Sequence, residues 1–290
     1  MSNIHGFSNF QNNTNSRPLT ISSSNNAPSG KDDRLYDSSN YRIKTVSFWL
    51  IASNVTIFVI EFLAYHLYFA RKNMTWLCCL TTLGNFQVGK VVNHYQYIRF
   101  ISSLFLHQTW IHLCSNMLSL FFLGFQVESE LKNQKQFAIL YFISGLHGNF
   151  LSMLFNQINF SVGASGAIIG LCGNFVIYFL LNYRNMSDRK KYSYGFMFLA
   201  LFFNLFSGLS EGGKSINMYA HIGGFLGGLA YSSILIYKKN PSYKTNSFVK
   251  KIYLISIIYL IALPVVTLVF VHFKKIPNVA DFVCLLKSNK

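Results

Sequence analysis

Long runs of apolar residues, separated by shorter polar segments, follow one another along the chain from about residue 46. Several of these runs reach the roughly 20 residues that an α-helix needs to cross a bilayer. The pattern predicts seven helices, at about 46–70, 111–127, 136–156, 163–182, 194–210, 218–237 and 252–273. Between the first two helices, residues 71–105 are mixed and rich in aromatic side chains, which favours a structured loop.

The composition indicates where these helices lie. Half of the residues (51%) are apolar and only 12% are charged, whereas about a quarter of the residues of a soluble domain carry charge. We therefore expect an all-α polytopic membrane protein. A net charge of +16 would indicate nucleic acid in a soluble chain. Here the basic residues lie in tails and loops and set the topology. We therefore expect the chain to contact membrane lipid and not to bind nucleic acid.

The chain is expected to have three parts. Residues 1–45 are rich in Asn and Ser, cannot bury enough apolar surface to fold, and are predicted to form a disordered cytosolic tail without a signal peptide. Residues 46–237 form a six-helix core. Residues 238–290 supply a cytosolic linker, a seventh helix that contains Pro264, and a short tail.

The five cysteines do not follow a zinc-binding spacing. Cys114 and Cys172 lie within apolar runs, where a small buried thiol is expected. Cys78 and Cys79 are adjacent in the loop, and the sequence leaves their redox state open.

Lys and Arg residues predict the orientation in the membrane. They gather before the first helix, after the fourth and after the sixth, and segments rich in these residues stay in the cytosol. The loop over residues 71–105 also carries basic residues, spread over a long segment. Helices 2, 4 and 6 would then all begin at the lumenal or extracellular face, in a membrane that the sequence does not name.

Polar residues stand near the start of each of these three helices. His112 and Asn116 are four residues apart in helix 2 and share one helix face. Ser165 lies near the start of helix 4, and His221 lies near the start of helix 6. Polar groups are costly in a membrane and mark either function or helix packing.

Packing is the alternative interpretation. Ser165 lies among small residues that allow two helices to approach closely, and helix 6 carries similar glycines. These are Gly163, Gly166, Gly224 and Gly228. What favours chemistry is that a hydroxyl, two imidazoles and a carboxamide are predicted at one depth from three helices.

This set is the one that a serine hydrolase needs. Ser165 becomes a nucleophile when a base removes its proton, and His221 is the candidate base. Gly224 and Gly228 would bring the helix of His221 close to Ser165. The backbone N–H of Ser165 and the side chains of His112 and Asn116 could donate to a developing oxyanion.

Other protease chemistries lack their residues. An aspartyl protease needs two aspartates in the membrane, and no aspartate falls in a predicted helix. The HExxH motif of zinc proteases is absent. Because no acid is placed to complete a triad, a hydrolase built on these residues would work with a serine–histidine dyad.

At these residues the sequence resembles the rhomboid family of intramembrane serine proteases, over roughly residues 46–237. The GxSG motif is Gly163 to Gly166, the HxxxN motif is His112 to Asn116, and the AHxxGxxxG motif runs from Ala220 to Gly228. The arginine of the family's first loop matches Arg99, followed by His107, and the glutamate that ends helix 2 matches Glu128. The Asn- and Lys-biased composition and the extra C-terminal helix resemble rhomboids of apicomplexan parasites.

The resemblance implies cleavage of single-span membrane proteins, such as parasite surface adhesins, in or near their transmembrane segment. Ser165 would be the nucleophile and His221 the base, while His112 and Asn116 would help the oxyanion hole. No metal or soluble cofactor would be needed, and Arg99 and Glu128 would be structural.

Two positions depart from the family pattern. Ile98 stands where a tryptophan usually precedes the loop arginine, and Ile169 where a tyrosine often stacks on the catalytic histidine. The orientation of His221 is therefore an open question. A protease fold that binds membrane clients without cutting them, and a small transporter, are the alternative functions.

Other polar residues have more ordinary interpretations. Glu61 would face neighbouring helices or loop water, and His147 would make a packed bond between helices. His107 could assist the site from the loop, and the seventh helix is interpreted as an added structural span.

Overall fold

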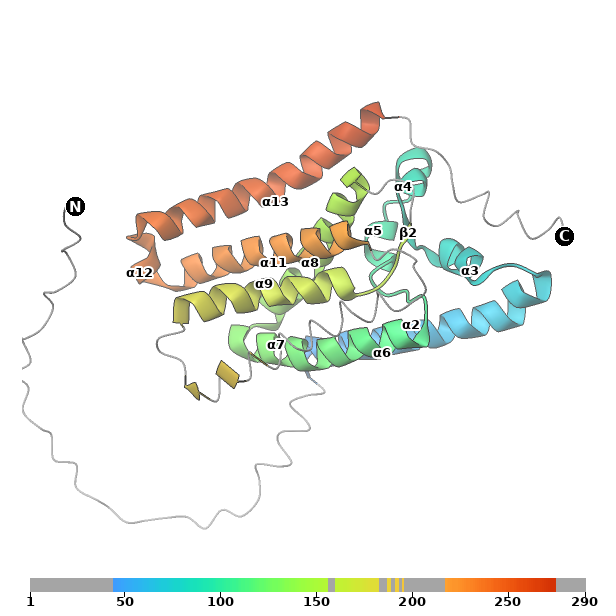
Figure 1. The fold of residues 1–290 in the computed structure, drawn as a ribbon, viewed down its shortest axis with the longest axis horizontal. Coiled ribbons are helices and arrows are strands. Elements are labelled where there is room, and N and C mark those ends of the chain that lie inside the picture. The colour runs from blue at the N-terminus through green and yellow to red at the C-terminus, as the bar shows by residue number, and fades with distance from the viewer. Residues whose placement is uncertain are drawn as a thin grey trace, which may run out of the picture. The chain divides into compact units, whose positions relative to one another are not determined.

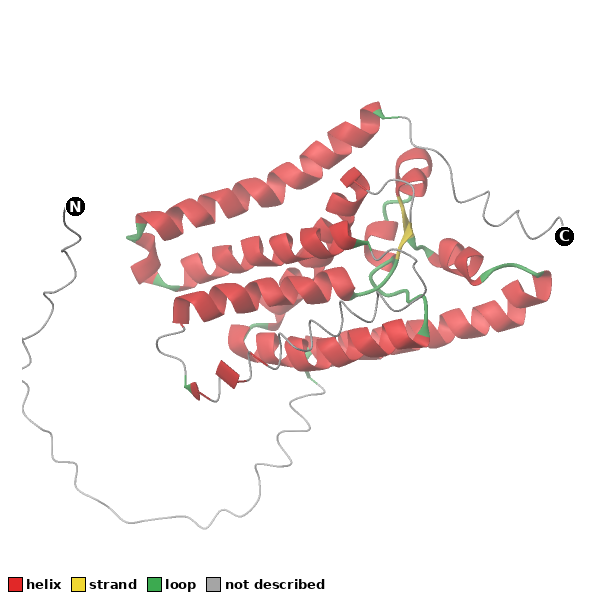
Figure 2. Cartoon of the chain, in the orientation of Figure 1, coloured by secondary structure: helices red, strands yellow, loops and turns green. Residues whose placement is uncertain are grey.

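The computed structural model describes residues 44–155, 160–182 and 217–274, with isolated positions at 187, 188, 191, 192 and 195. Within this part of the chain almost every element is a helix (Figures 1 and 2). Five helical segments are long and apolar enough to span a bilayer: Val46–Lys72, Trp110–Leu131, Gln134–Phe155, Met218–Lys239 and Ser247–Phe273. The chain is therefore an integral multi-pass membrane protein with an all-α fold, as predicted.

The spans match the predicted helices closely. The first comprises α2 (Val46–Ala64), η1 (Tyr65–Phe69) and η2 (Ala70–Lys72), and the second α6 (Trp110–Ser119), η3 (Leu120–Gly124) and α7 (Phe125–Leu131). The other three spans are α8 (Gln134–Phe155), α11 (Met218–Lys239) and α13 (Ser247–Phe273), and α9 (Ser165–Asn182) is a further apolar helix that is not among the five. The helix predicted at 194–210 lies outside the described residues, apart from Gly195.

Helices α9 and α13 do not begin at the predicted residues. Helix α9 begins at Ser165 because Gly163 takes a φ of 115°, a conformation that interrupts a right-handed helix. Helix α13 begins at Ser247, earlier than predicted, because the side chain of Asn246 accepts hydrogen bonds from the N–H groups of Phe248 and Val249. A short helix, α12 (Pro241–Lys244), precedes it.

The long first loop is structured, as predicted. It contains α3 (Trp76–Leu83), β1 (Phe86–Gln87), α4 (Val88–His94) and α5 (Arg99–Ser102). Strand β1 pairs antiparallel with β2 (Phe160–Ser161), with Phe86 opposite Ser161. Because β2 lies just before α9, this pairing ties the first loop to the segment that leads into Ser165.

Arg99 fastens the same loop from within. Its side chain is buried and donates to the carbonyl oxygens of Thr81 (2.9 Å) and Asn85 (2.7 Å) and to the side chain of Gln96 (2.6 Å). Burial lowers the pKa of Arg99 from its ordinary value, but a guanidinium remains charged in proteins. One side chain therefore connects α3, the turn before β1 and the start of α5.

The thiols also contribute to the loop. Cys78 is disulfide-bonded, and Cys79 is a buried free thiol. Burial, with the charge of Glu61 as a smaller cause, raises the pKa of Cys79 to about 11. Cys172 is buried as predicted, whereas the prediction for Cys114 is wrong, because its side chain lies on the outward face of α6 and is exposed.

Glycines allow α11 to lie against both α9 and α8, and Figure 1 shows α9, α11 and α13 running side by side. A Cβ at Gly224 would overlap the carbonyl oxygen of Gly166, and one at Gly228 would overlap that of Gly170. These backbones are therefore in direct contact, and any larger side chain would force α11 away from α9.

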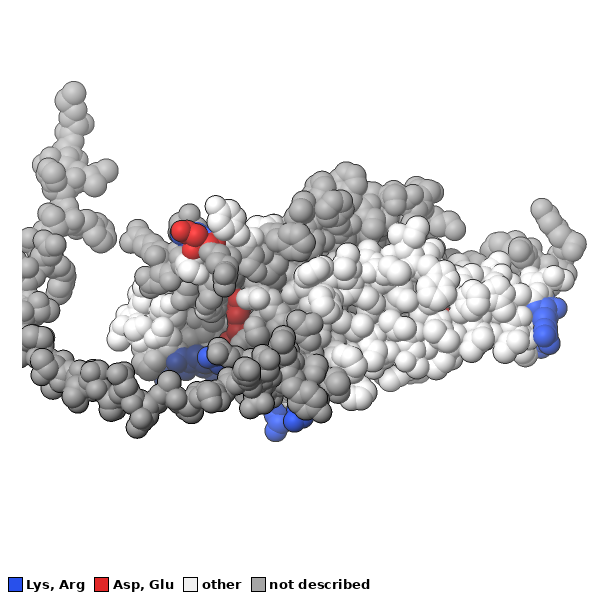
Figure 3. All heavy atoms as spheres, turned by 90° about the horizontal axis from the view of Figure 1, so that it is seen from below, with Lys and Arg blue, Asp and Glu red and all other residues white. Residues whose placement is uncertain are grey.

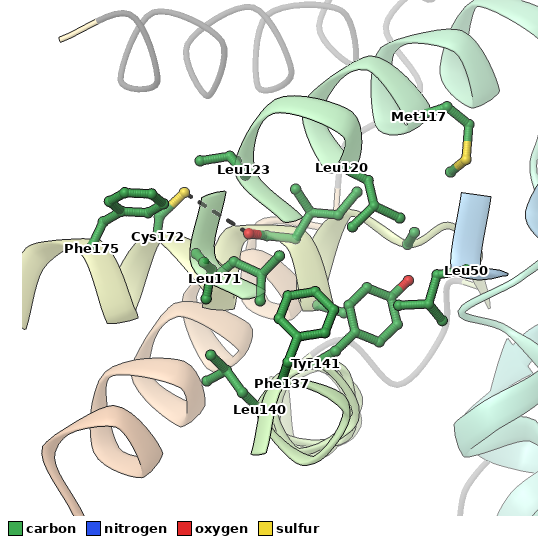
Figure 4. Packing of buried hydrophobic residues seen from close by; sticks show 14 of the residues in the cluster. Leu50, Met117, Leu120, Leu123, Phe137, Leu140, Tyr141, Leu171, Cys172 and Phe175 are labelled. Atoms are coloured by element: carbon green, nitrogen blue, oxygen red, sulfur yellow. Dashed lines mark hydrogen bonds between the residues drawn. The ribbon is translucent and has the colours of Figure 1, made fainter. Parts of the chain in front are cut away.

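The main core fills the space between α2, α6, η3, α8 and α9. Figure 4 shows Leu171 of α9 lying close to Phe137, Leu140 and Tyr141 of α8. Many large apolar side chains are exposed on the outside of the helices, and Figure 3 shows on one face a long stretch of uncharged side chains between charged groups at either end. An apolar surface of this kind suits contact with lipid.

Glu128 joins the end of the second span to the start of the first. Its buried carboxylate accepts the N–H groups of Val46 (2.7 Å) and Ser47 (2.9 Å) and the hydroxyl of Ser47 (2.7 Å). These N–H groups have no partner within α2, and a negative charge at a helix N-terminus is favourable.

We expect Glu128→Ala to destabilise the fold strongly. Hydrogen bonds to charged groups contribute about 1.5–3 kcal/mol each, and the loss of three should lower the midpoint of thermal unfolding in detergent by roughly 10 °C or more. Ser129→Ala changes a neighbouring exposed side chain and should leave the midpoint almost unchanged. Equal midpoints for the two variants would contradict this role of Glu128.

Candidate functional site

The hydroxyl of Ser165 and the imidazole of His221 meet at the starts of α9 and α11. Oγ of Ser165 lies 2.8 Å from Nε2 of His221, within the range of an O–H···N hydrogen bond. Ser165 is half-buried and His221 is buried. The glycine contacts between α9 and α11 bring the two side chains together although 56 residues separate them.

Asn217 fixes the start of the helix that carries His221. Its side-chain oxygen accepts the N–H of Ala220 at 3.2 Å, and its amide nitrogen contacts the hydroxyl of Ser152 on α8. An Asn before an apolar helical run is a typical N-cap, so the sequence carried a signal for Asn217 that our prediction missed.

The backbone before Ser165 is held by the first loop. Gly163 donates its N–H to the carbonyl of Ser103 at 2.9 Å and turns the chain with its positive φ. Ser165 is the first residue of α9, and the first N–H groups of a helix have no acceptor within it. This turn therefore leaves the N–H of Ser165 available beside its own hydroxyl.

His112 and Asn116 lie on the other side of this turn. A Cβ at Gly163 would come within 2.7 Å of the His112 ring and 3.3 Å of Nδ2 of Asn116. The two side chains predicted to share a face of helix 2 therefore both face the segment before Ser165. A side chain larger than hydrogen at position 163 would occupy the space between them.

Asn116 is held in turn by His107. Its Nδ2 lies 3.0 Å from Nε2 of His107, and Nδ1 of His107 lies 3.2 Å from the carbonyl of Phe105. A neutral ring with its proton on Nδ1 satisfies both contacts, because it donates to the carbonyl and accepts from the amide. Burial, and the nearby His112 as a smaller cause, lower the pKa of His107 to about 3, which keeps the ring neutral at physiological pH.

Glu61 reaches the same network from the first span. Its buried carboxyl group accepts the backbone N–H of His107 at 3.3 Å. The side chain of Glu61 therefore faces the loop segment before α6. No periodicity in α2 distinguishes Glu61 as a partner of His107, because the contact joins residues 46 positions apart.

His221 has no acid behind it in the described part of the chain. Its Nδ1 makes no hydrogen bond there, and no group of three or more His, Cys, Asp or Glu side chains among the described residues could hold a metal ion. A hydroxyl against an imidazole, with backbone and side-chain donors nearby, is an arrangement suited to acyl transfer.

Within the described part of the chain, the remaining predicted residues make no hydrogen bond to the hydroxyl of Ser165 or the ring of His221. Gly166 and Gly224 form the contact between α9 and α11, while Arg99 and Glu128 bond to other parts of the fold. Ile98 is 68% exposed, and Ile169 is buried in α9. His147 does not join the site and instead contacts α13.

Comparison with known proteins places these residues in a family context. The family model described as "Rhomboid domain" matches residues 94–238. RHOMBOID-like protein 2 of Arabidopsis thaliana is 35% identical over 57% of this chain and 50% of its own length. RHOMBOID-like protein 4 of the same plant is 37% identical over 54% of this chain and 39% of its own. Rhomboid-like protease 3 of Toxoplasma gondii is 33% identical over 48% and 51%. The chain thus spans about half of these relatives or less.

Proposed function

This chain belongs to the rhomboid family, and we propose that it is an intramembrane serine protease that cleaves single-span membrane proteins in or near their transmembrane segment. The contact of 2.8 Å between Ser165 and His221 carries this proposal. Two of the residues that the rhomboid resemblance assigns to catalysis meet here with the geometry that the reaction needs.

The reaction follows the usual course of a serine hydrolase. His221 takes the proton of Ser165 as Oγ attacks the scissile carbonyl, and the resulting imidazolium gives that proton to the leaving amine. An acyl-enzyme on Ser165 remains. Water then attacks the ester carbonyl with His221 again as the base, which releases the new carboxyl terminus and restores the hydroxyl.

The oxyanion would lie between α6 and the start of α9. The N–H of Ser165 and the side chains of His112 and Asn116 border this position, and Gly163 leaves it open. Each donor of an oxyanion hole typically contributes about 10²–10³-fold to kcat. The proposed mechanism uses no metal and no cofactor.

A helical peptide bond cannot reach Ser165 without unwinding, so substrates should carry helix-destabilising residues near the cleavage site. Surface adhesins of the kind that the resemblance to parasite rhomboids suggests belong in the first substrate panel. Stiffening a cleaved substrate with Leu should slow its cleavage, and an unchanged rate would contradict this requirement.

We also propose that the N-terminus is cytosolic and that the site opens to the lumenal or extracellular side. Lys239 donates to the carbonyl of Leu131 at 3.0 Å, and Gln134 donates to that of Lys44, so these residues share one end of the bundle, opposite to the site. That end is rich in lysine, as cytosolic ends are. Epitope tags at the N-terminus should resist protease added outside sealed cells.

The proposed function is tested by reconstituting the full chain in liposomes with single-span proteins labelled at both ends. We expect two fragments, with new termini that mass spectrometry maps to the transmembrane segment or its edge. Stable binding of the same substrates without fragments, across the whole panel, would overturn the protease assignment in favour of a client-binding protein.

His107 provides a more specific test, because it accepts from Asn116. We expect His107→Leu to lower kcat about tenfold, less than the loss of a whole oxyanion donor, with KM almost unchanged. In an Asn116→Ala background the same substitution should have little further effect, because the amide that it positions is gone. Additive losses in the double variant would show that His107 does not act through Asn116.

A further inference from the structure

Helix α13 contains a proline that leaves one of its carbonyl groups without the usual partner. Pro264 lies inside Ser247–Phe273 and has no N–H, so it cannot donate to the carbonyl of Leu260 four residues earlier. The hydrocarbon region of a bilayer offers no water to replace that bond. An unpaired carbonyl at this depth needs a donor from a neighbouring helix.

His147 of α8 supplies a donor at this carbonyl. Its Nε2 lies 3.3 Å from the carbonyl oxygen of Leu260, the ring is buried, and it packs 5.6 Å from the ring of Tyr259. Its Nδ1 lies 2.9 Å from the carbonyl of Ile143. The N–H of His147 already bonds to that carbonyl in a regular helix. A neutral ring has one proton for these two carbonyl contacts, so only one of them is a hydrogen bond. Donation from Nε2 pairs the carbonyl that Pro264 leaves without its helical partner, whereas the carbonyl of Ile143 keeps its helical bond without the ring, and we assign the proton to Nε2 on this ground.

The same turn of α8 supports the helix that carries His221. A Cβ at Gly227 would meet Cβ of His147 at 2.8 Å, and a Cβ at Gly148 would meet the carbonyl oxygen of Ala220 at 2.5 Å. Ala220 directly precedes His221. His147 thus lies where α8, α11 and α13 meet, one residue from a backbone contact with the turn that holds the proposed base.

We propose that His147 is a positioning residue, which fastens α13 to α8 by donating to the carbonyl of Leu260 and thereby steadies the first turn of α11. The hydrogen bond between His147 and Leu260 concerns the fold and does not depend on the proposed protease activity. Its effect on His221 rests on the proposed function. Helix α13, the predicted seventh helix, then helps to position the proposed catalytic base.

A double-mutant cycle with Pro264→Ala tests the fastening. Alanine restores the N–H that Leu260 lacks, so the bond from His147 becomes dispensable. In the wild-type background we expect His147→Leu to lower the midpoint of thermal unfolding in detergent by about 2–4 °C. In the Pro264→Ala background the shift should fall to less than half. An equal shift in both backgrounds, or no shift in either, would overturn the proposal.

Thr267 offers a matched control on the same pair of helices. Its hydroxyl contacts the carbonyl of Phe150 at 3.5 Å, a contact that does not involve Pro264. Thr267→Val should therefore shift the midpoint equally in both backgrounds. His147→Gln keeps an amide donor and should retain more of the wild-type midpoint than His147→Leu does. A glutamine variant as unstable as the leucine variant would count against the hydrogen bond.

Kinetics test the effect on His221, at a temperature well below the lowest midpoint. We expect His147→Leu to lower kcat about 3–10-fold with KM unchanged, a smaller loss than a displacement of 1 Å in the site would cause, and Pro264→Ala to restore part of it. If His147→Leu left kcat unchanged while the stability cycle with Pro264→Ala was non-additive, the effect on His221 would be overturned and the bond to α13 would stand. Failure of the proposed function would differ from both outcomes, because the wild-type chain itself would not cleave.

Discussion

Replacing Ser165 with alanine is expected to reduce cleavage of a reconstituted single-span substrate by at least about 10⁴-fold, to the detection limit of a gel assay. In the proposed mechanism Oγ of Ser165 forms the acyl-enzyme, and within the described part of the chain this hydroxyl lies 2.8 Å from Nε2 of His221. His221→Ala should cause a loss of similar size, because the hydroxyl then keeps its proton. The double variant should be no worse than either single one, since nucleophile and base act as a unit.

The control for the dyad must show that the fold survives. Removing the hydroxyl of Ser165 deletes one hydrogen bond at a half-buried position, so the thermal midpoint should change little. Ser233→Ala removes a hydroxyl from the neighbouring helix α11, where the side chain of Ser233 donates to the carbonyl of Leu229. This variant should cleave the substrate at the wild-type rate. Cleavage by folded Ser165→Ala at the wild-type rate would rule out this serine as the nucleophile.

The helices could be predicted from the sequence because the apolar composition of each one reflects its own surroundings. A helix such as Ser247–Phe273 must be apolar along its whole length to face lipid, and this property is local. Its start was predicted too late because a charged first turn hides the boundary, although Asn246 marks it. The structured nature of the first loop was predictable, but the pairing of Phe86 with Ser161 was not, since two-residue strands leave no periodic pattern.

The predicted site residues converge for a similar reason, because their distance from the helix starts can be counted. Their supports are harder to predict. Glu61 reaches His107 across 46 residues and His147 reaches Leu260 across 113, and neither contact follows from the spacing within one helix. Pro264 did carry a usable signal, because a proline in a span predicts an unpaired carbonyl, but the sequence alone does not say which neighbour donates to it.

Gly224→Ala is expected to separate Ser165 from His221 without removing either. A Cβ at this position would overlap the carbonyl oxygen of Gly166, which is backbone and cannot rotate away. Helix α11 must then move from α9, and a displacement of about 1 Å can cost on the order of 10²-fold in rate. Overpacking should also destabilise the fold by about 1–3 kcal/mol. Both losses should appear together, as a lower kcat and a lower thermal midpoint.

Gly195 provides the matched control, because a Cβ there would meet nothing within 4 Å. Gly195→Ala should keep the wild-type rate and midpoint, which separates a general effect of losing glycine from the loss of close helix contact. Gly228→Ala tests the same contact between α9 and α11 one turn further along α11, where a Cβ would overlap the carbonyl oxygen of Gly170. If Gly224→Ala cleaved the substrate like the wild type, the close contact between α9 and α11 would not be what brings His221 to Ser165. Close helix approach could then no longer explain why these glycines surround the serine.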